Sequence, residues 1–180
     1  MKRKPNTVGG GSRTNLNGLS FEERKDLLES INQHPHFEVK GNKVFQNNKV
    51  VGEYFEKYNF YTSFLEKKGV NWKEINSKQY LPDSIFYNHE NRTVYVIEKK
   101  YQAGTGSVDE KLQTCDFKKK MYKNLITPLG LKTEYYYLLN DWFNKPVYED
   151  VFSYIEEVDC KYFIDFMPLS ELGLDEKVTK

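Results

Sequence analysis

The chain has 180 residues, with 27 Lys and Arg, 26 Asp and Glu and three His, which give a formal net charge of +1 at pH 7. This length predicts one globular domain, and no apolar run approaches the roughly 20 residues that a membrane-spanning helix requires. Two cysteines make neither a disulfide framework nor a zinc cluster, and the basic start lacks the apolar stretch of a secretory signal, so we expect a reduced, cytoplasmic protein. The near-zero net charge by itself argues against a nucleic-acid partner, which favours a basic surface.

The first 18 residues have the composition of a flexible basic arm. Such a segment is either a plain disordered terminus or an arm that contacts phosphate groups, and its composition leaves both open. We expect residues 19–180 to form the single folded domain. The arm contains a Gly-Gly-Gly-Ser run, no acidic residue, and the basic residues Lys2, Arg3, Lys4 and Arg13.

The domain begins with the signals of a helix, a hairpin and a second helix. Ser20 to Glu23 has the S-x-x-E form of a capping box, which predicts a helix start. The segment from Phe37 to Val51 is typical of a hairpin, with two turns rich in Gly and Asn. Aromatic and apolar residues then recur at helical spacing from about Glu53 to Lys68, and Gly69 follows where a helix C-cap belongs.

The remaining elements alternate between strands and helices. The order of all elements, αββ, α, ββ, α, β, α, β, predicts an α/β (α+β) domain. The predicted strands are 83–87, 93–102, 134–139 and 162–166. The predicted helices are 107–125, which opens with a capping box at Ser107, and 147–158.

An unusual set of charged residues ends the strand predicted at 93–102. Because side chains alternate faces along a strand, Glu98, Lys100 and Gln102 share the face that the earlier valines occupy. A carboxylate and an ammonium in that position are costly unless they are paired or used. The short turn before this strand places Asp83 on the neighbouring strand, near Glu98.

Two carboxylates and a lysine at one sheet edge indicate metal-assisted phosphodiester chemistry. Carboxylate oxygens suit Mg²⁺, which keeps several waters and also takes phosphate oxygens as ligands. Bound Mg²⁺ holds a phosphodiester, lowers the pKa of a water and stabilises the leaving oxygen, while a lysine offsets the charge that develops at phosphorus. The same residues are also compatible with an ordinary exposed ion pair on a half-buried strand, which contributes little.

The pattern resembles the PD-(D/E)XK nuclease superfamily, which includes most type II restriction endonucleases. Pro82-Asp83 matches the first half of the motif, and Glu98-Lys99-Lys100 matches the second half, 15 positions later and ahead of a crossover helix. The tract from Gly106 to Gln113 also looks like restriction endonucleases of this group. The resemblance covers roughly residues 53–166 and implies a restriction-endonuclease-like core, in which helices flank a central mixed β-sheet.

The resemblance implies a role for each residue of the site. Asp83 and Glu98 would be Mg²⁺ ligands, with Mn²⁺ as a substitute metal, and Lys100 would be the catalytic lysine. The family often adds a glutamate from the preceding helix. Glu56 is the candidate for this third metal ligand, and Glu53 competes with it.

Several residues near this site are candidates for contacts with DNA. Lysines gather in the second half of the helix predicted at 107–125, where they either neutralise phosphates or form a solvated helix face. The backbone N–H groups at the start of that helix suit a phosphate, although a capped helix start also explains the same residues. The DNA-contact candidates are Gln102, Ser107, Lys111, Lys118 and Lys119.

The function implied by the resemblance is a Mg²⁺-dependent endodeoxyribonuclease, and within that class a type II site-specific restriction endonuclease that cleaves double-stranded DNA. One motif in a short chain then predicts a homodimer, and a restriction enzyme would be accompanied by a cognate DNA methyltransferase. The catalytic core would span 52–167, with recognition or dimerisation elements at 19–51. The alternatives are a junction-resolving or repair nuclease of the same fold and a non-catalytic DNA-binding protein. The near-neutral charge does not oppose a DNA partner, because the basic residues cluster and can form a basic face.

Overall fold

The structure is a computed structural model that describes residues 27–104 and 106–174. The predicted basic arm and the predicted helix start at Ser20 lie outside the described residues. No helix in the described part of the chain is long and apolar enough to cross a membrane. The helices are α2 (Leu27–Gln33), α3 (Lys57–Asn59), α4 (Trp72–Ile75), α5 (Val108–Leu112), α6 (Cys115–Ile126) and α7 (Glu149–Glu157). The strands are β1 (Glu38–Lys40), β2 (Lys43–Gln46), β3 (Lys49–Phe55), β4 (Ser84–Asn88), β5 (Thr93–Lys100), β6 (Lys132–Leu139) and β7 (Lys161–Ile164).

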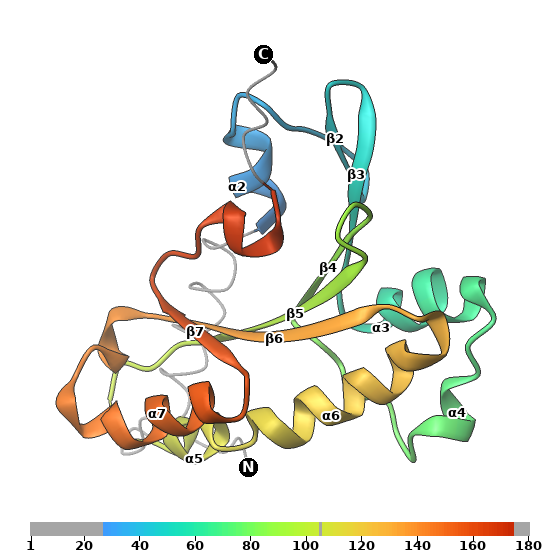
Figure 1. Cartoon of the computed structure of the whole chain (residues 1–180). Coiled ribbons are helices and arrows are strands. Elements are labelled where there is room, and N and C mark those ends of the chain that lie inside the picture. Colours follow the sequence, from blue (N-terminus) through green and yellow to red (C-terminus); the bar gives the residue numbers. More distant parts are fainter. Residues whose placement is uncertain (1–26, 105, 175–180) are drawn as a thin grey trace, which may run out of the picture.

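The strands form one mixed sheet whose spatial order follows the chain order, from β1 at one edge to β7 at the other. Strands β1 to β5 pair antiparallel, through short turns except between β3 and β4, where residues 56–83 with α3 and α4 form the connection. Strands β5, β6 and β7 are parallel and are joined by helical crossovers. The sheet is strongly twisted, so the β2–β3 hairpin stands steeply against β6 (Figure 1). The expected α+β domain with a mixed sheet and flanking helices is therefore confirmed for the described residues.

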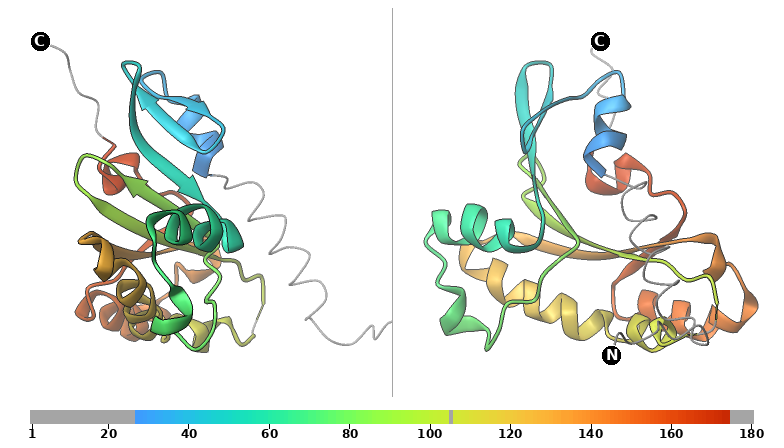
Figure 2. Two further views of the ribbon diagram at one scale, coloured as in Figure 1. Left: turned by 90° about the vertical axis from the view of Figure 1, so that its right-hand side faces the viewer. Right: turned by 180° about the vertical axis from the view of Figure 1, so that it is seen from behind.

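Helices cover both faces of this sheet (Figures 1 and 2). Alternate residues of β5 enter two separate cores, because the pleat sends neighbouring side chains to opposite faces. Val94 and Val96 point to what we call the α6 face, where α6 and α7 pack. Tyr95 and Ile97 point to what we call the α2 face, where α2 and the 3₁₀ turn Leu169–Leu172 pack.

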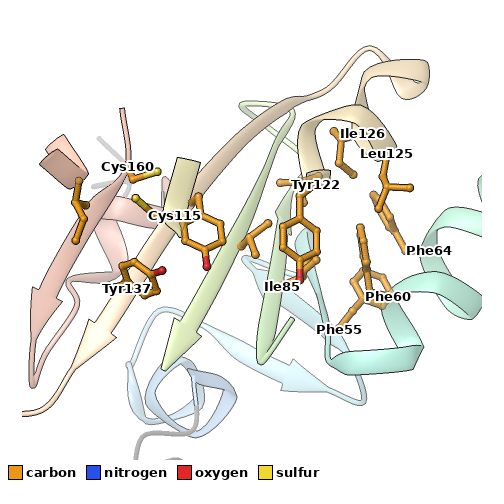
Figure 3. Packing of buried hydrophobic residues seen from close by; sticks show 14 of the residues in the cluster. Phe55, Phe60, Phe64, Ile85, Cys115, Tyr122, Leu125, Ile126, Tyr137 and Cys160 are labelled. Carbon is orange, nitrogen blue, oxygen red and sulfur yellow. The ribbon is translucent and has the colours of Figure 1, made fainter. Parts of the chain in front are cut away.

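The core on the α6 face is the larger one and is dominated by aromatic rings (Figure 3). Tyr122 of α6 packs edge to face on Phe60, with ring centroids 6.2 Å apart. At the other end of α6, the buried thiols of Cys115 and Cys160 lie close together, as Figure 3 shows. Both cysteines are free.

The predicted hairpin at 37–51 is confirmed, and it comprises β1, β2 and most of β3. Asn47 and Asn48 form its second turn with φ of 52° and 60°, the left-handed conformation that a two-residue hairpin turn requires. Gly52 of β3 is needed for a different reason. A Cβ at this position would lie 2.3 Å from Cζ of Phe86, so close packing of β3 on β4 excludes a side chain.

The helix predicted from about Glu53 begins later than expected. Strand β3 continues to Phe55 and pairs with β4, so the helical stretch starts after Glu56. It winds successively as α3, as a π turn over Phe60–Leu65 and as a 3₁₀ turn over Glu66–Lys68. Gly69 then ends it with φ of 77°, in the C-cap role that the sequence predicted.

The single helix predicted over 107–125 is wrong, because the structure divides it into α5 and α6. The break falls at Gln113 and Thr114. There the Thr114 hydroxyl donates to the Lys111 carbonyl over 2.7 Å, a local bond that competes with continuation of the helix. The break allows α6 to start in a new direction, with Cys115 buried and its length running beneath the sheet (Figure 1).

Candidate active site

Asp83 and Glu98 lie side by side at one end of the β4–β5 ladder. Ser84 of β4 pairs with Ile97 of β5, so the residue before Ser84 falls opposite Glu98. The N–H of Lys99 donates to Asp83 Oδ2 over 2.9 Å and closes this end of the ladder. The carboxyl ends of the parallel strands β5 and β6 reach the same edge, which is where open α/β sheets bind their ligands.

The segment that precedes Asp83 is held from several sides. The hydroxyls of Tyr61 and Tyr122 donate to the Tyr80 carbonyl over 2.8 and 3.0 Å. The Pro82 carbonyl accepts a hydrogen bond of 3.0 Å from the first backbone N–H of α3. Burial raises the pKa of Tyr61 to about 12, so its hydroxyl remains a donor at neutral pH. These contacts set the position of Asp83, which itself precedes β4.

Glu98 is buried in the most completely covered strand of the sheet. Every residue of β5 except the last is buried, and Glu98 follows Val94 and Val96 on the α6 face. An unpaired carboxylate in such a place would cost several kcal/mol, so Glu98 needs a cation beside it.

Two lysines supply that compensating charge. Lys100 Nζ lies 2.9 Å from Glu98 Oε2 and 3.4 Å from Asp83 Oδ2, so one ammonium joins both carboxylates. Lys118 Nζ, from α6, lies 3.1 Å from the same Glu98 oxygen. We call these four side chains the charge cluster. The exposed side-chain fraction rises from 5% for Glu98 to 24% for Asp83 and 27% for Lys118, so the cluster opens to solvent on the side of Asp83 and Lys118.

The electrostatics of the cluster define the protonation state of Lys100. Burial lowers the pKa of its ammonium, but the carboxylates of Glu98 and Asp83 raise it by more, and the pKa lies above its usual value. Lys100 is therefore a cation at neutral pH and acts as a hydrogen-bond donor rather than as a base. The pKa of the nearby Tyr122 is also raised, first by burial and then by the charge of Glu98.

The donor set fits a divalent cation such as Mg²⁺. This ion is commonly bound by one or two protein carboxylates, with waters and substrate phosphate filling the other positions. Asp83 and Glu98 supply two carboxylates that already share one cation, the Lys100 ammonium. Within residues 27–104 and 106–174, no group of three or more His, Cys, Asp or Glu side chains gathers as a metal site, so waters and a ligand would have to complete the coordination.

The two candidates for a third carboxylate do not join the charge cluster. Glu56 Oε1 accepts a hydrogen bond of 2.5 Å from the hydroxyl of Tyr54, which belongs to the core on the α2 face. The Glu56 carboxylate therefore lies on the opposite side of the sheet from Glu98. Glu53 lies 3.4 Å from Nε2 of His89, at the other end of β4.

The lysine and serine candidates for DNA contact are separated in the structure. Lys118 is a member of the charge cluster. The ammonium of Lys119 instead donates to the Asp159 carbonyl, which follows α7. Ser107 and Lys111 are exposed, one just before α5 and one in its last turn.

Gln102 is buried, with 1% of its surface exposed, and lies just beyond the end of β5. The Asn140 side chain makes two hydrogen bonds with the backbone of Gln102. It accepts from the Gln102 N–H over 2.9 Å and donates to the Gln102 carbonyl over 2.8 Å. Sequence reasoning misses Asn140, although its place directly after β6, at the same edge as the cluster, is a usable signal. Asn140 thus joins the chain segments that leave β5 and β6.

No protein-family model matches the chain. Comparisons with curated proteins and with solved structures also give no match. The interpretation of the charge cluster therefore depends on its geometry and chemistry.

Proposed function

We propose that the protein is a Mg²⁺-dependent endodeoxyribonuclease, and specifically a type II site-specific restriction endonuclease that acts on double-stranded DNA. The observation that carries the proposal is the meeting of Asp83, Glu98 and Lys100 at one end of the β4–β5 ladder. The PD-(D/E)XK resemblance assigns the site to these same three residues. Of the three, Asp83 and Lys100 retain 24% and 18% of their side-chain exposure, so a phosphate would approach from their side.

The order of elements also supports a restriction-endonuclease-like core. The motif residues sit on the antiparallel β4–β5 pair, and α5 and α6 form the crossover to the parallel strand β6. A further helix, α7, leads to the parallel strand β7. A helix, a hairpin with the motif, a crossover helix, a strand, a helix and a strand form the arrangement that the resemblance implies.

Each residue of the cluster has a role in phosphodiester hydrolysis. Asp83 and Glu98 would hold Mg²⁺, or Mn²⁺ in its place, which supplies a Lewis acid for the phosphate and for the attacking water. Lys100, a cation at neutral pH, would donate to the phosphoryl oxygens as negative charge develops on them. Lys118 is more exposed and would neutralise a phosphate of the DNA backbone.

A second candidate function is DNA binding without cleavage. One observation favours it, because the two carboxylates and two ammonium groups of the cluster neutralise each other without a metal. A buried ion network of this kind needs no catalytic role to explain it. A junction-resolving or repair nuclease of the same fold would share the proposed site and differ in the form of DNA that it cuts.

A cleavage assay with matched variants tests the proposal. Purified protein is incubated with plasmid DNA and Mg²⁺, beside the variants Asp83→Asn and Lys100→Met. The controls are Lys132→Met and Asp150→Asn, which change an exposed lysine of β6 and an exposed aspartate of α7. We expect discrete fragments from the wild type and from both controls, and a loss of at least about 100-fold in rate for the two cluster variants.

Other outcomes discriminate between the candidate functions. Cleavage that survives Asp83→Asn or Lys100→Met would refute the assignment of the site. DNA binding that is the same with Mg²⁺ and with EDTA, without cleavage under Mg²⁺ or Mn²⁺, would favour the binding protein. Cleavage of four-way junctions in preference to linear plasmid would favour the junction-resolving nuclease.

A further inference from the structure

A pocket lies on the α2 face, on the other side of the strand that carries the charge cluster. It has a volume of about 310 Å³ and is enclosed by α2, by the ends of β5 and β6 and by the segment that follows β7. The helix α2 and the turn at 169–172 belong to the same core on this face (Figures 1 and 2). Most of the described lining is apolar, with Leu27, Ile97, Leu138, Phe166, Met167 and Leu169.

The ammonium of Lys99 is the exception in this apolar lining. Lys99 stands between Glu98 and Lys100 in β5, so the pleat directs its side chain to the α2 face, away from the charge cluster. The residue is 5% exposed. In the parts of the chain that the structure describes, no hydrogen bond or ion pair involves its Nζ atom. An ammonium that faces an apolar pocket without a counter-ion is poorly compensated, so an anion that enters the pocket would meet a complementary charge.

The other polar groups of the lining do not neutralise Lys99. Asp165 also lines the pocket, but its Oδ1 accepts a hydrogen bond of 3.0 Å from the Asp141 N–H, and the carboxylate makes no ion pair with Lys99. Ser30 of α2 and His34, which follows α2, also line the pocket. One ammonium therefore faces a mainly apolar space.

We propose that this pocket, which we call the Lys99 pocket, binds a small amphipathic organic anion. Its acidic group would pair with the Lys99 ammonium, and its apolar body would lie against Leu138 and Met167. The volume suits a molecule of small-ligand size rather than a polymer. The pocket lies on the opposite face of the sheet from Asp83 and Glu98, so the proposal does not depend on the nuclease function.

The test uses 8-anilinonaphthalene-1-sulfonate, a fluorescent probe that combines an anion with an apolar body. The folded protein is titrated with this probe and with N-phenyl-1-naphthylamine, which has the same ring systems and no charge. The variants are Lys99→Met, which removes the ammonium, and Lys132→Met, which removes an exposed lysine of β6 as a control. We expect one binding site for the sulfonate, with affinity lowered about tenfold or more by Lys99→Met and unchanged by Lys132→Met.

A second measurement keeps the proposal testable if Lys99→Met does not fold. Octanoate and octanol are compared as competitors of the sulfonate on the wild-type protein, and octanoate is expected to displace it at much lower concentration. Leu169→Trp, which fills the pocket from the 3₁₀ turn, is expected to block the sulfonate while retaining the far-UV spectrum of the wild type. Equal affinity of Lys99→Met and wild type, or equal competition by octanol and octanoate, would overturn the proposal.

Discussion

Replacing Lys100 by Met tests the electrostatic description of the charge cluster without reference to activity. The substitution removes the ammonium that contacts Glu98 Oε2 at 2.9 Å and Asp83 Oδ2 at 3.4 Å, and it keeps most of the aliphatic volume. Removing one partner of a buried pair typically costs about 3–5 kcal/mol. Lys118 still neutralises part of the Glu98 charge, and solvent reaches Asp83, so we expect a loss of about 2–3 kcal/mol.

Urea unfolding followed by circular dichroism measures this loss. A decrease of about 2–3 kcal/mol corresponds to a midpoint lower by about 1 M urea for a chain of this size. The double variant Lys100→Met, Glu98→Gln should lose less stability than the sum of the two single variants. Without Lys100 the Glu98 and Asp83 carboxylates repel each other, and Glu98→Gln removes one of these two charges. Mg²⁺ should stabilise Lys100→Met more than the wild type, since a divalent cation can replace the missing charge between the two carboxylates.

Three results would contradict this reasoning. The first is a stability of Lys100→Met within about 0.5 kcal/mol of the wild type, which is the usual effect of a surface substitution. The second is strict additivity with Glu98→Gln, which would mean that the two groups do not interact. The third is an equal loss in the control Lys43→Met, where the lysine is exposed on β2 and contacts neither carboxylate.

Three further predictions follow from other parts of the structure. Gly52→Ala should lower the free energy of unfolding by about 1–3 kcal/mol in urea, because the added Cβ meets the ring of Phe86, and a midpoint equal to that of the wild type would refute this. Asn88→Ala should lower it by about 1–3 kcal/mol, since the buried Asn88 amide donates to the Leu172 carbonyl over 2.9 Å, and limited proteolysis should then release the C-terminal segment sooner. Burial raises the pKa of Tyr61 to about 12, above its unfolded value of about 10. The contribution of Tyr61 to stability is therefore complete below about pH 10 and is lost as the pH rises through about 12. Ultraviolet titration of the folded protein should show tyrosines that ionise above about pH 10.

The strands that carry the cluster could be predicted because their signals are local. The segments on either side of the turn after β4 either alternate between apolar and polar residues or are continuously apolar. The turn between them is so short that few registers of the two strands are possible. With that register, Asp83 falls opposite Glu98, and the pleat places Lys100 on the same face as Glu98. The meeting of these three residues is therefore a consequence of strand periodicity and one turn length.

The placement of Glu56 could not be predicted in the same way. Tyr54 and Phe55 suit both a strand and the aromatic helix that follows, so the sequence does not show where β3 ends. Because the strand continues to Phe55, the next side chain falls on the α2 face, and a shift of one residue is enough to reverse the face. The contact of Lys118 with Glu98 could not be predicted from the sequence either, since it depends on how α6 packs against the sheet.

The chain-ordered sheet has a consequence for how the protein folds during synthesis. Each strand pairs with an edge that already exists when that strand emerges, and no strand has to insert between two earlier ones. The pairs β1–β2, β2–β3 and β4–β5 form through short turns, and such local pairing favours rapid folding. Asp83 and Glu98 meet as soon as the β4–β5 hairpin closes, whereas Lys118 arrives only when α6 has been made and has docked. The nascent chain therefore passes through a stage with two adjacent carboxylates and a single lysine, and the charge of the cluster is balanced only when α6 docks.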